Sequence, residues 1–162
     1  MNLAARVLTL GRVRLEPFEE RHREALATLA AAEPENFRHM PFAVERLGYS
    51  QWFDLLRSDQ AAGRSIPHTI FVDGQIAGQS CYLNIRPRDA GVEIGSTWYA
   101  RRVQRTALNT ECKRMLLAHA FEALDCIAVE FRTHFFNHQS RRGIERLGAK
   151  QDGILRNHQI AP

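Results

Sequence analysis

The sequence predicts an α+β domain built on a mixed β-sheet. The expected order of elements is strand, two helices, three strands, helix, strand, helix and strand. Strands that follow one another directly predict antiparallel hairpins, and the later strand–helix–strand units predict parallel neighbours, so the sheet should be mixed. No repeat, low-complexity tract or linker divides residues 1–162, and we therefore expect a single domain.

The N-terminal part predicts one strand and two helices. Residues 12–16 alternate apolar and polar side chains, which is typical of a short strand. Residues 19–32 carry Ala, Leu, Glu and Arg at helical spacing and predict an amphipathic helix. Ser50 is a suitable N-cap for a second helix that ends near Ala62.

The middle of the chain predicts three strands. Residues 66–72 and 75–85 should pair through Asp73-Gly74, because Asp-Gly favours the two-residue turns of β-hairpins. Residues 91–99 predict a further strand, in which Gly95 indicates a bulge or a close backbone approach.

The C-terminal part returns to a mixed pattern. Residues 105–124 carry an apolar helical stripe and predict the longest helix. Residues 127–133 predict a strand, residues 139–147 a short helix, and residues 153–159 a last strand.

Composition limits the functional classes. Lys and Arg number 22 and Asp and Glu 18, and no basic run is interleaved with aromatic residues, so nucleic-acid binding is not indicated. No apolar stretch approaches the ~20 residues of a membrane helix. Cys81, Cys112 and Cys126 form no C-x-x-C pair and predict reduced core residues in a cytoplasmic protein.

Several common catalytic motifs are missing from the sequence. It contains no G-x-G-x-x-G after a strand, no P-loop signature, no H-E-x-x-H and no G-x-S-x-G. The seven histidines lack metal-ligand spacing, and we expect no metal site.

The corner between the strand ending near Tyr99 and the helix beginning near Arg105 is the strongest candidate site. A helix start offers unpaired N–H groups and the positive end of the helix dipole, which together bind phosphate. Arg101, Arg102 and Lys113 add positive charge nearby. The alternative is an ordinary strand–helix connection with solvated arginines, and the residues alone leave both open.

Four blocks of sequence around this corner carry a family resemblance. They are VEIGSTWYA (92–100), RTALNTECKRMLLAHAFEALDC (105–126), VEFRTHFFNHQSRRGIERLGA (129–149) and DGILRNH (152–158). In this order and spacing they resemble the GNAT superfamily of N-acetyltransferases, close to its RimJ/RimL-like branch of ribosomal-protein acetyltransferases.

The resemblance implies a GNAT-type acyl-CoA N-acyltransferase fold. This fold is an α/β sandwich with a mostly antiparallel sheet, about four helices and a splay between the family's fourth and fifth strands. Acetyl-CoA would be the co-substrate. Its pyrophosphate would lie on the loop 102–107 and its pantetheine arm along residues 98–100. The implied cofactor-binding residues are Trp98, Tyr99, Ala100, Arg102, Gln104, Arg105, Thr106, Ala107, Asn109, Lys113, Asn137 and Ser140.

The sequence departs from the family pattern at two places. Arg105 stands where the family prefers a glycine, and we expect it to offer its N–H group and charge to phosphate only if its backbone stays in the ordinary helical region. The printed sequence ends at Pro162, before the family's final strand. The resemblance therefore implies that the final strand is lost, is truncated, or is supplied by another chain, as in a homodimer.

The implied reaction is direct transfer of an acetyl group to a primary amine, which must lose a proton to a base. Glu93 is the candidate base, with a solvent-facing strand glutamate as the alternative. Ser140 and Tyr99 are candidate acids, and Ser140 could instead be a plain N-cap. His134 and His138 lie nearby, although loop histidines are more often surface groups.

The amine is expected between the first two helices and the central hairpin. The RimJ/RimL resemblance suggests a protein N-terminal amine, and a small amine is the alternative. The aromatic and sulfur side chains that could line the acceptor pocket, or simply pack the core, are Phe37, Met40, Phe42, Tyr49, Trp52 and Tyr82. A non-catalytic acyl-CoA-binding or protein-interaction module is the second hypothesis.

Overall fold

The structure is a computed structural model that describes residues 5–40 and 44–158. In this part of the chain six strands form one sheet in the order β1-β2-β3-β4-β5-β6. Neighbouring strands are antiparallel except β5 and β6, which are parallel, so the predicted mixed sheet is confirmed. The strands are β1 (Leu8–Leu10), β2 (Val13–Pro17), β3 (Ile66–Val72), β4 (Gln75–Arg86), β5 (Gly91–Tyr99) and β6 (Ala128–Glu130).

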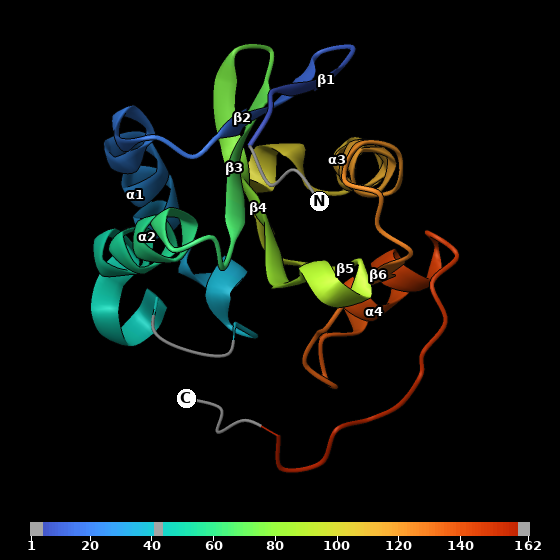
Figure 1. Cartoon of the computed structure of the whole chain (residues 1–162). Coiled ribbons are helices and arrows are strands. Elements are labelled where there is room, and N and C mark those ends of the chain that lie inside the picture. The colour runs from blue at the N-terminus through green and yellow to red at the C-terminus, as the bar shows by residue number, and fades with distance from the viewer. Residues whose placement is uncertain (1–4, 41–43, 159–162) are drawn as a thin grey trace.

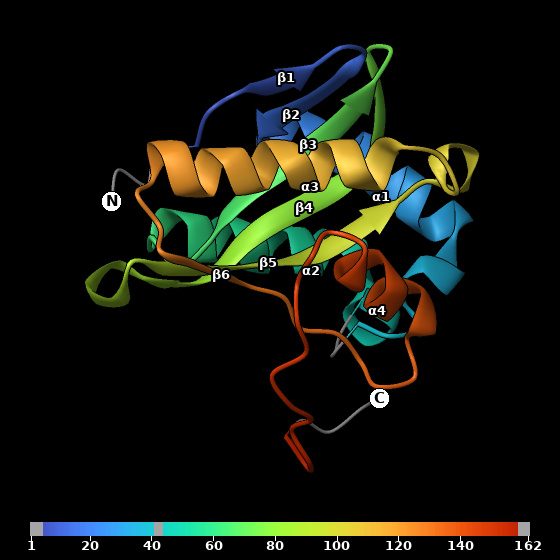
Figure 2. The ribbon, with the colours of Figure 1, turned by 90° about the vertical axis from the view of Figure 1, so that its right-hand side faces the viewer.

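Helices cover both faces of the sheet. Figure 1 shows α1 and α2 on one face and α3 on the other, and Figure 2 shows α3 running across its face of the sheet. The short helix α4 lies near the C-terminal end of β5. The α-helices are α1 (Arg23–Ala32), α2 (Val44–Ala61), α3 (Leu108–Ala118) and α4 (His138–Glu145). A π-helical turn, His119–Ala123, extends α3, and short 3-10 turns lie at Glu20–His22, Pro34–Phe37, Pro87–Asp89 and Arg101–Val103.

Two apolar clusters hold these layers together. Under α3, Val92 and Ile94 of β5 pack against Leu108, Cys112 and Leu116. On the opposite face, an aromatic cluster buries Phe18, Phe37, Tyr49, Trp52, Phe53 and Trp98 against α1 and α2. The sheet is therefore buried on both sides, which explains its long apolar runs.

Most predicted elements are confirmed with small shifts at their ends, but the strand predicted over 127–133 covers only Ala128–Glu130. The Asp73-Gly74 hairpin is present, and both residues adopt the positive φ angles, 51° and 78°, that a two-residue turn requires. The predicted helix over 105–124 begins later, at Leu108, and β1 was not predicted because it has only three residues, two of them exposed.

Two predictions in the fold were wrong. Ser50 is not the N-cap, because the helix that follows the break at Gly48 (φ 72°, ψ 159°) already includes Ser50, although this helix is present and ends at Ala61, close to the predicted end. Residues 153–158 form no strand, although their sequence alternates enough to suggest one, and they are exposed. Figure 2 shows this segment extending away from the sheet, with no strand partner to stabilise it among the described residues.

The three cysteines are free and buried, as predicted. Burial raises the pKa of each thiol, so the thiols remain protonated core groups. Within residues 5–40 and 44–158, no helix is long and apolar enough to cross a membrane.

Candidate active site

The sheet opens between its last two strands. β5 and β6 pair only over Gly91–Glu93 and Ala128–Glu130. The remaining residues of β5, from Ile94 to Tyr99, have no strand partner on that side among the described residues. This is the splay that the resemblance implied, and it leaves an open strand edge beside the N-terminal end of α3 and beside α4 (Figure 2).

A β-bulge lies in the open part of β5. Gln79 and Cys81 of β4 pair with Trp98 and Gly95, so two residues of β5 stand opposite one residue of β4. Ser96, within the bulge, has a positive φ of 47°. The predicted irregularity near Gly95 is thus confirmed, one residue further along.

The bulge reverses which face of the sheet each β5 side chain occupies. Before it, Ile94 packs under α3 and Glu93 faces the other way. After it, Thr97 contacts Lys113 on α3 while Trp98 packs on the α1–α2 side. Extended strands alternate faces at every residue, so without the extra residue Thr97 would share the face of Glu93.

The loop after β5 presents backbone N–H groups to solvent. Arg105, Thr106 and Ala107 are exposed, and α3 begins at Leu108. The N–H of Leu108 donates to Thr106 Oγ1 (3.2 Å), whereas those of Arg105, Ala107 and Thr110 have no hydrogen-bond partner in the part of the chain that the structure describes. Free N–H groups at the positive end of a helix dipole form an anion site.

The backbone of Arg105 differs from the expectation. Its φ is 59°, in the left-handed region, so the expected helical conformation was wrong. Glycine adopts this region at no steric cost, which explains the family's preference at this position. The loop keeps the glycine-like turn despite the arginine, and the side chain is exposed beside the free N–H groups.

Side chains from the α1–α2 connection fix the start of this loop. Gln104 Nε2 donates to Asn36 Oδ1 (2.8 Å) and to the carbonyl oxygen of Tyr99 (2.7 Å). Asn36 Nδ2 donates to the same carbonyl (3.1 Å), and the N–H of Arg101 donates to Glu33 Oε2 (2.8 Å). Sequence reasoning missed Glu33 and Asn36, because they lie more than sixty positions before the loop.

The predicted pantetheine strand is only partly available for new hydrogen bonds. The Tyr99 carbonyl already accepts two, and the N–H of Ala100 donates to the Ala77 carbonyl (2.8 Å). Trp98 is buried in the aromatic cluster. Arg102, at the start of the loop, donates to the Ile76 carbonyl (2.7 Å), which leaves its other guanidinium nitrogens exposed.

Tyr99 links β5 to α3. Its hydroxyl donates to Asn109 Oδ1 (3.1 Å), and burial raises its pKa well above the ordinary range. Asn109 also lies beside Gly143 of α4. This contact brings β5, α3 and α4 together at the open edge.

The residue that caps α4 is Asn137 and not Ser140. Asn137 is the N-cap, and its Oδ1 accepts from the N–H of Ser140 (3.1 Å). The N-cap interpretation of Ser140 was therefore wrong. The Ser140 hydroxyl is half-buried and makes no hydrogen bond within the described residues.

Lys113 lies farther from the loop than expected. It is 6% exposed, and its Nζ donates to Thr97 Oγ1 (2.7 Å) instead of pointing towards the free N–H groups. Burial lowers the pKa of its amine to about 7.

Glu93 is buried at the point where the strands begin to part. It is 6% exposed, so the solvent-facing alternative was wrong. Asn84 Nδ2 donates to Glu93 Oε2 (2.6 Å), and Arg132 Nε lies 3.4 Å from the same oxygen. The other carboxylate oxygen lies near Gly95.

The predicted acceptor side chains are mostly core. Phe37, Tyr49 and Trp52 are at least nine-tenths buried in the aromatic cluster, and Met40 packs against it. Tyr82 lies on the opposite face, where its hydroxyl donates to the Leu116 carbonyl (2.6 Å), so its placement in this pocket was wrong. Phe42 lies outside the described residues.

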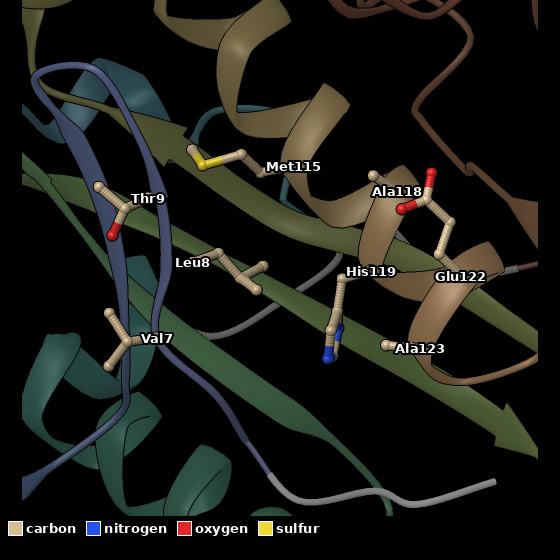
Figure 3. A pocket seen from close by; sticks show the side chains of 8 residues that line it. All are labelled: Val7, Leu8, Thr9, Met115, Ala118, His119, Glu122 and Ala123. Atoms are coloured by element: carbon tan, nitrogen blue, oxygen red, sulfur yellow. The ribbon is translucent and has the colours of Figure 1, made fainter.

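An open pocket of about 510 Å³ lies elsewhere, between β1 and the C-terminal half of α3. Figure 3 shows the Leu8 side chain pointing from β1 toward His119 across it. β1 and the splay are at opposite ends of the strand order, so this pocket is separate from the candidate active site. Among the described residues, no cluster of three or more His, Cys, Asp or Glu could hold a metal ion.

The splayed sheet and the exposed loop at the start of α3 agree with the fold that the resemblance implied. The model of the Acetyltransferase (GNAT) domain matches residues 12–150, and the chain belongs to this family. It is an acetyl-CoA-dependent N-acetyltransferase, and the resemblance found in the sequence is confirmed. A search of the curated proteins found no match.

Solved structures share the whole fold. A T. thermophilus protein described as an acetyltransferase is 28% identical, with a TM-score of 0.83, and the match covers 98% of this chain and 83% of that one. Mycobacterium smegmatis RimJ in complex with CoA-disulfide is 23% identical (TM-score 0.82; 97% and 80% covered). A Salmonella typhimurium acetyltransferase that modifies the N-terminal serine of ribosomal protein L7/L12 is 15% identical (TM-score 0.83; 97% and 92% covered). The last two show the fold alone.

Proposed function

We propose that this chain, acting as one acetyltransferase domain, transfers the acetyl group of acetyl-CoA directly to a protein N-terminal amine. The observation that carries the cofactor's placement is the exposed loop at the start of α3, with free N–H groups at Arg105, Ala107 and Thr110 among the described residues. Backbone N–H groups bind pyrophosphate without a metal, because the helix dipole favours negative charge there.

The cofactor's path follows from this anchor. The pantetheine arm would run from the loop into the gap beside β5, where residues 94–99 lack a strand partner in the described part of the chain. The other proposed cofactor contacts come from the end of β5, the loop, the first turn of α3 and α4. They are Trp98, Tyr99, Ala100, Arg102, Gln104, Thr106, Asn109, Asn137 and Ser140.

Glu93 is proposed as the base that receives the proton of the attacking amine. Its carboxylate lies where the gap begins, and Asn84 and Arg132 hold it from one side. A base must lie within hydrogen-bond reach of its proton or act through one water. The bulge at Ser96 lies on the same strand, three residues after Glu93. Because a bulge leaves its extra residue out of the strand pairing, a free backbone N–H there would bind the oxygen of the thioester.

The N-terminal amine is proposed from the relatives. RimJ and the Salmonella enzyme share the fold, and the latter is named for modifying an N-terminal serine. A homodimer in the cytoplasm is part of the same proposal. Ile127 and Phe136, on the β6 side, are 81% and 65% exposed, which favours a partner surface there. Light scattering in solution tests the dimer.

Calorimetry and a thiol-release assay test the proposed function. Acetyl-CoA should bind much more tightly than acetyl-pantetheine, which lacks the pyrophosphate. Peptides with a free N-terminus should release CoA, whereas the same peptides with a blocked N-terminus should not. Release with small amines only would overturn the N-terminal acceptor. Binding without release on any amine would instead support the non-catalytic module.

A further inference from the structure

The sequence contains two lysines, Lys113 and Lys150, and of these Lys113 is buried. It is 6% exposed, whereas Lys150 is exposed. Lysines are almost never buried without a charged partner. Yet Lys113 makes no ion pair with a carboxylate in the part of the chain that the structure describes. A buried lysine without a charged partner lowers the free energy of unfolding. A residue that is kept despite this cost is a candidate for a role in the site.

Neutral hydroxyls hold the amine in place. Lys113 Nζ donates to Thr97 Oγ1 (2.7 Å) and lies 3.4 Å from Ser80 Oγ, and the two hydroxyls are themselves 2.7 Å apart. The bulge at Ser96 places Thr97 on the α3 face, where it meets Lys113. The same local feature that opens β5 therefore also orients the amine.

The amine also lies at the splay. On one side it contacts Thr97, which is four residues beyond the last β5–β6 pair, Glu93 with Glu130. On the other side it lies 5.7 Å from the ring centre of Phe131, directly after β6. On the α3 face of the sheet, Nζ thus lies near side chains from both diverging strands, beside the gap where the pantetheine arm and its sulfur are proposed to lie.

The surroundings suit an amine that both holds and releases a proton. Burial lowers the pKa of Lys113 to about 7. The titratable groups that face it are the thiols of Cys112 on its own helix and Cys81 on β4, and burial raises the pKa of both to about 12. Neutral thiols cannot fix the lysine as a permanent cation. Catalytic acids work best when their pKa is near the working pH.

We propose that Lys113 is the general acid of acetyl transfer and gives its proton to the sulfur of coenzyme A. The acceptor nitrogen forms a bond to the acetyl carbon, and the carbon–sulfur bond breaks. The sulfur takes the proton of Lys113, the acceptor nitrogen loses one to the base, and Lys113 regains one from water. This inference rests on the proposed function. Tyr99 is less suited to the step, because its hydroxyl is already donated to Asn109.

The test compares Lys113→Met with Lys150→Met. Methionine fills the same space without a proton to donate. We expect Lys113→Met to lower kcat about 100-fold, the scale of a lost general acid, with little change in the affinity for acetyl-CoA by calorimetry. Lys150→Met should match the wild type. Equal kcat values for both variants would overturn the role of Lys113.

The pH dependence separates proton donation from packing. In the wild type, kcat should fall as the pH rises above about 7, because Lys113 then loses its proton. A variant without the amine should lack this alkaline decrease. The wild-type profile suffices if Lys113→Met does not fold, and a profile without an alkaline decrease would overturn the proposal.

Two further outcomes are informative. If incubation with acetyl-CoA places an acetyl group on Lys113, seen by peptide mass mapping against Lys150, the amine attacks the thioester itself and the proposal is wrong. If the wild type binds acetyl-CoA but releases no thiol with any amine, the proposed function fails and the role of Lys113 with it.

Discussion

Gly78 on β4 lies directly against the carbonyl oxygen of Trp98 on β5. A Cβ at Gly78 would come 2.1 Å from that oxygen, and the φ of Gly78 is 145°. Trp98 immediately follows the bulge and leads toward the loop 102–107. The absence of a side chain at Gly78 therefore fixes how closely β5 approaches β4 at the site.

Replacing Gly78 with alanine should move β5 and damage the site. Backbone cannot give way as a flexible side chain does, so we expect a loss of about 2–4 kcal/mol in the free energy of unfolding, from overpacking and the strained φ together. Urea unfolding measures the loss. Gly153→Ala is the control, because a Cβ at Gly153 meets no atom within 4 Å. Equal stability of both variants would show that β5 adjusts freely.

Variants of Arg105 provide a second test, which separates the effect of its backbone conformation from the effect of its charge. Its φ of 59° costs a non-glycine residue roughly 1–2 kcal/mol. Arg105→Gly relieves this strain at the cost of chain entropy, whereas Arg105→Ala keeps the strain and removes the charge. We expect the glycine variant to keep at least the wild-type Tm, and both variants to bind acetyl-CoA more weakly at low salt, because both lack the charge.

The same pair of variants also separates two explanations of how the loop would bind phosphate. If backbone N–H groups hold the phosphates, both variants retain most of the affinity measured by calorimetry. If the arginine side chain dominates, both variants lose affinity equally, and added salt weakens the wild type most.

Because of Lys113, the free energy of unfolding should increase as the pH rises. Its folded pKa of about 7 lies below the ordinary lysine value near ~10.4. Between these values the unfolded chain holds a proton that the folded chain has lost. Stability therefore rises with pH through this interval, and the full destabilisation is present below about pH 7.

Lys113→Met should remove this dependence. We expect the variant to be more stable than the wild type at pH 7, by on the order of a few kcal/mol, and the difference to shrink as the pH approaches 10. Urea unfolding at several pH values measures it, with Lys150→Met as the exposed control. A constant difference across this range would contradict a neutral folded lysine.

The sequence predicted the fold well because its signals are local. The Asp73-Gly74 turn, the strand over 66–72 and the strand over 91–99 each depend on neighbouring residues, and each is present with the predicted bounds. Residues 153–158 show the limit of this reasoning. Their pattern suits a strand, but strand formation needs a partner edge, which a pattern cannot supply.

The site was harder to predict because its contacts are distant in sequence. Glu33 and Asn36 reach the loop from the end of α1, and Ser80 and Thr97 meet Lys113 only after the sheet has formed. The burial of Lys113 could not be expected from its neighbours. One signal was visible: Lys113 falls next to Cys112 and three residues before Leu116, on the helix face that packs against the sheet.

Glu93 gives the last test, because a neighbouring glutamate supplies a matched control. Glu93 and Glu130 pair across β5 and β6, and both contact Arg132, at 3.4 Å and 3.6 Å. Glu93 is buried at the splay, whereas the Glu130 side chain is 41% exposed. Only Glu93 should therefore take part in proton transfer.

Glu93→Gln keeps the shape of the side chain and can still accept a hydrogen bond from Asn84, but it is no longer a base. We expect kcat/KM for the amine to fall about 100-fold, with acetyl-CoA binding nearly unchanged. Glu130→Gln should stay within a few-fold of the wild type in the thiol-release assay. If both variants lose activity equally, their shared contact with Arg132 matters for structure, and the proton of the amine passes to water instead of Glu93.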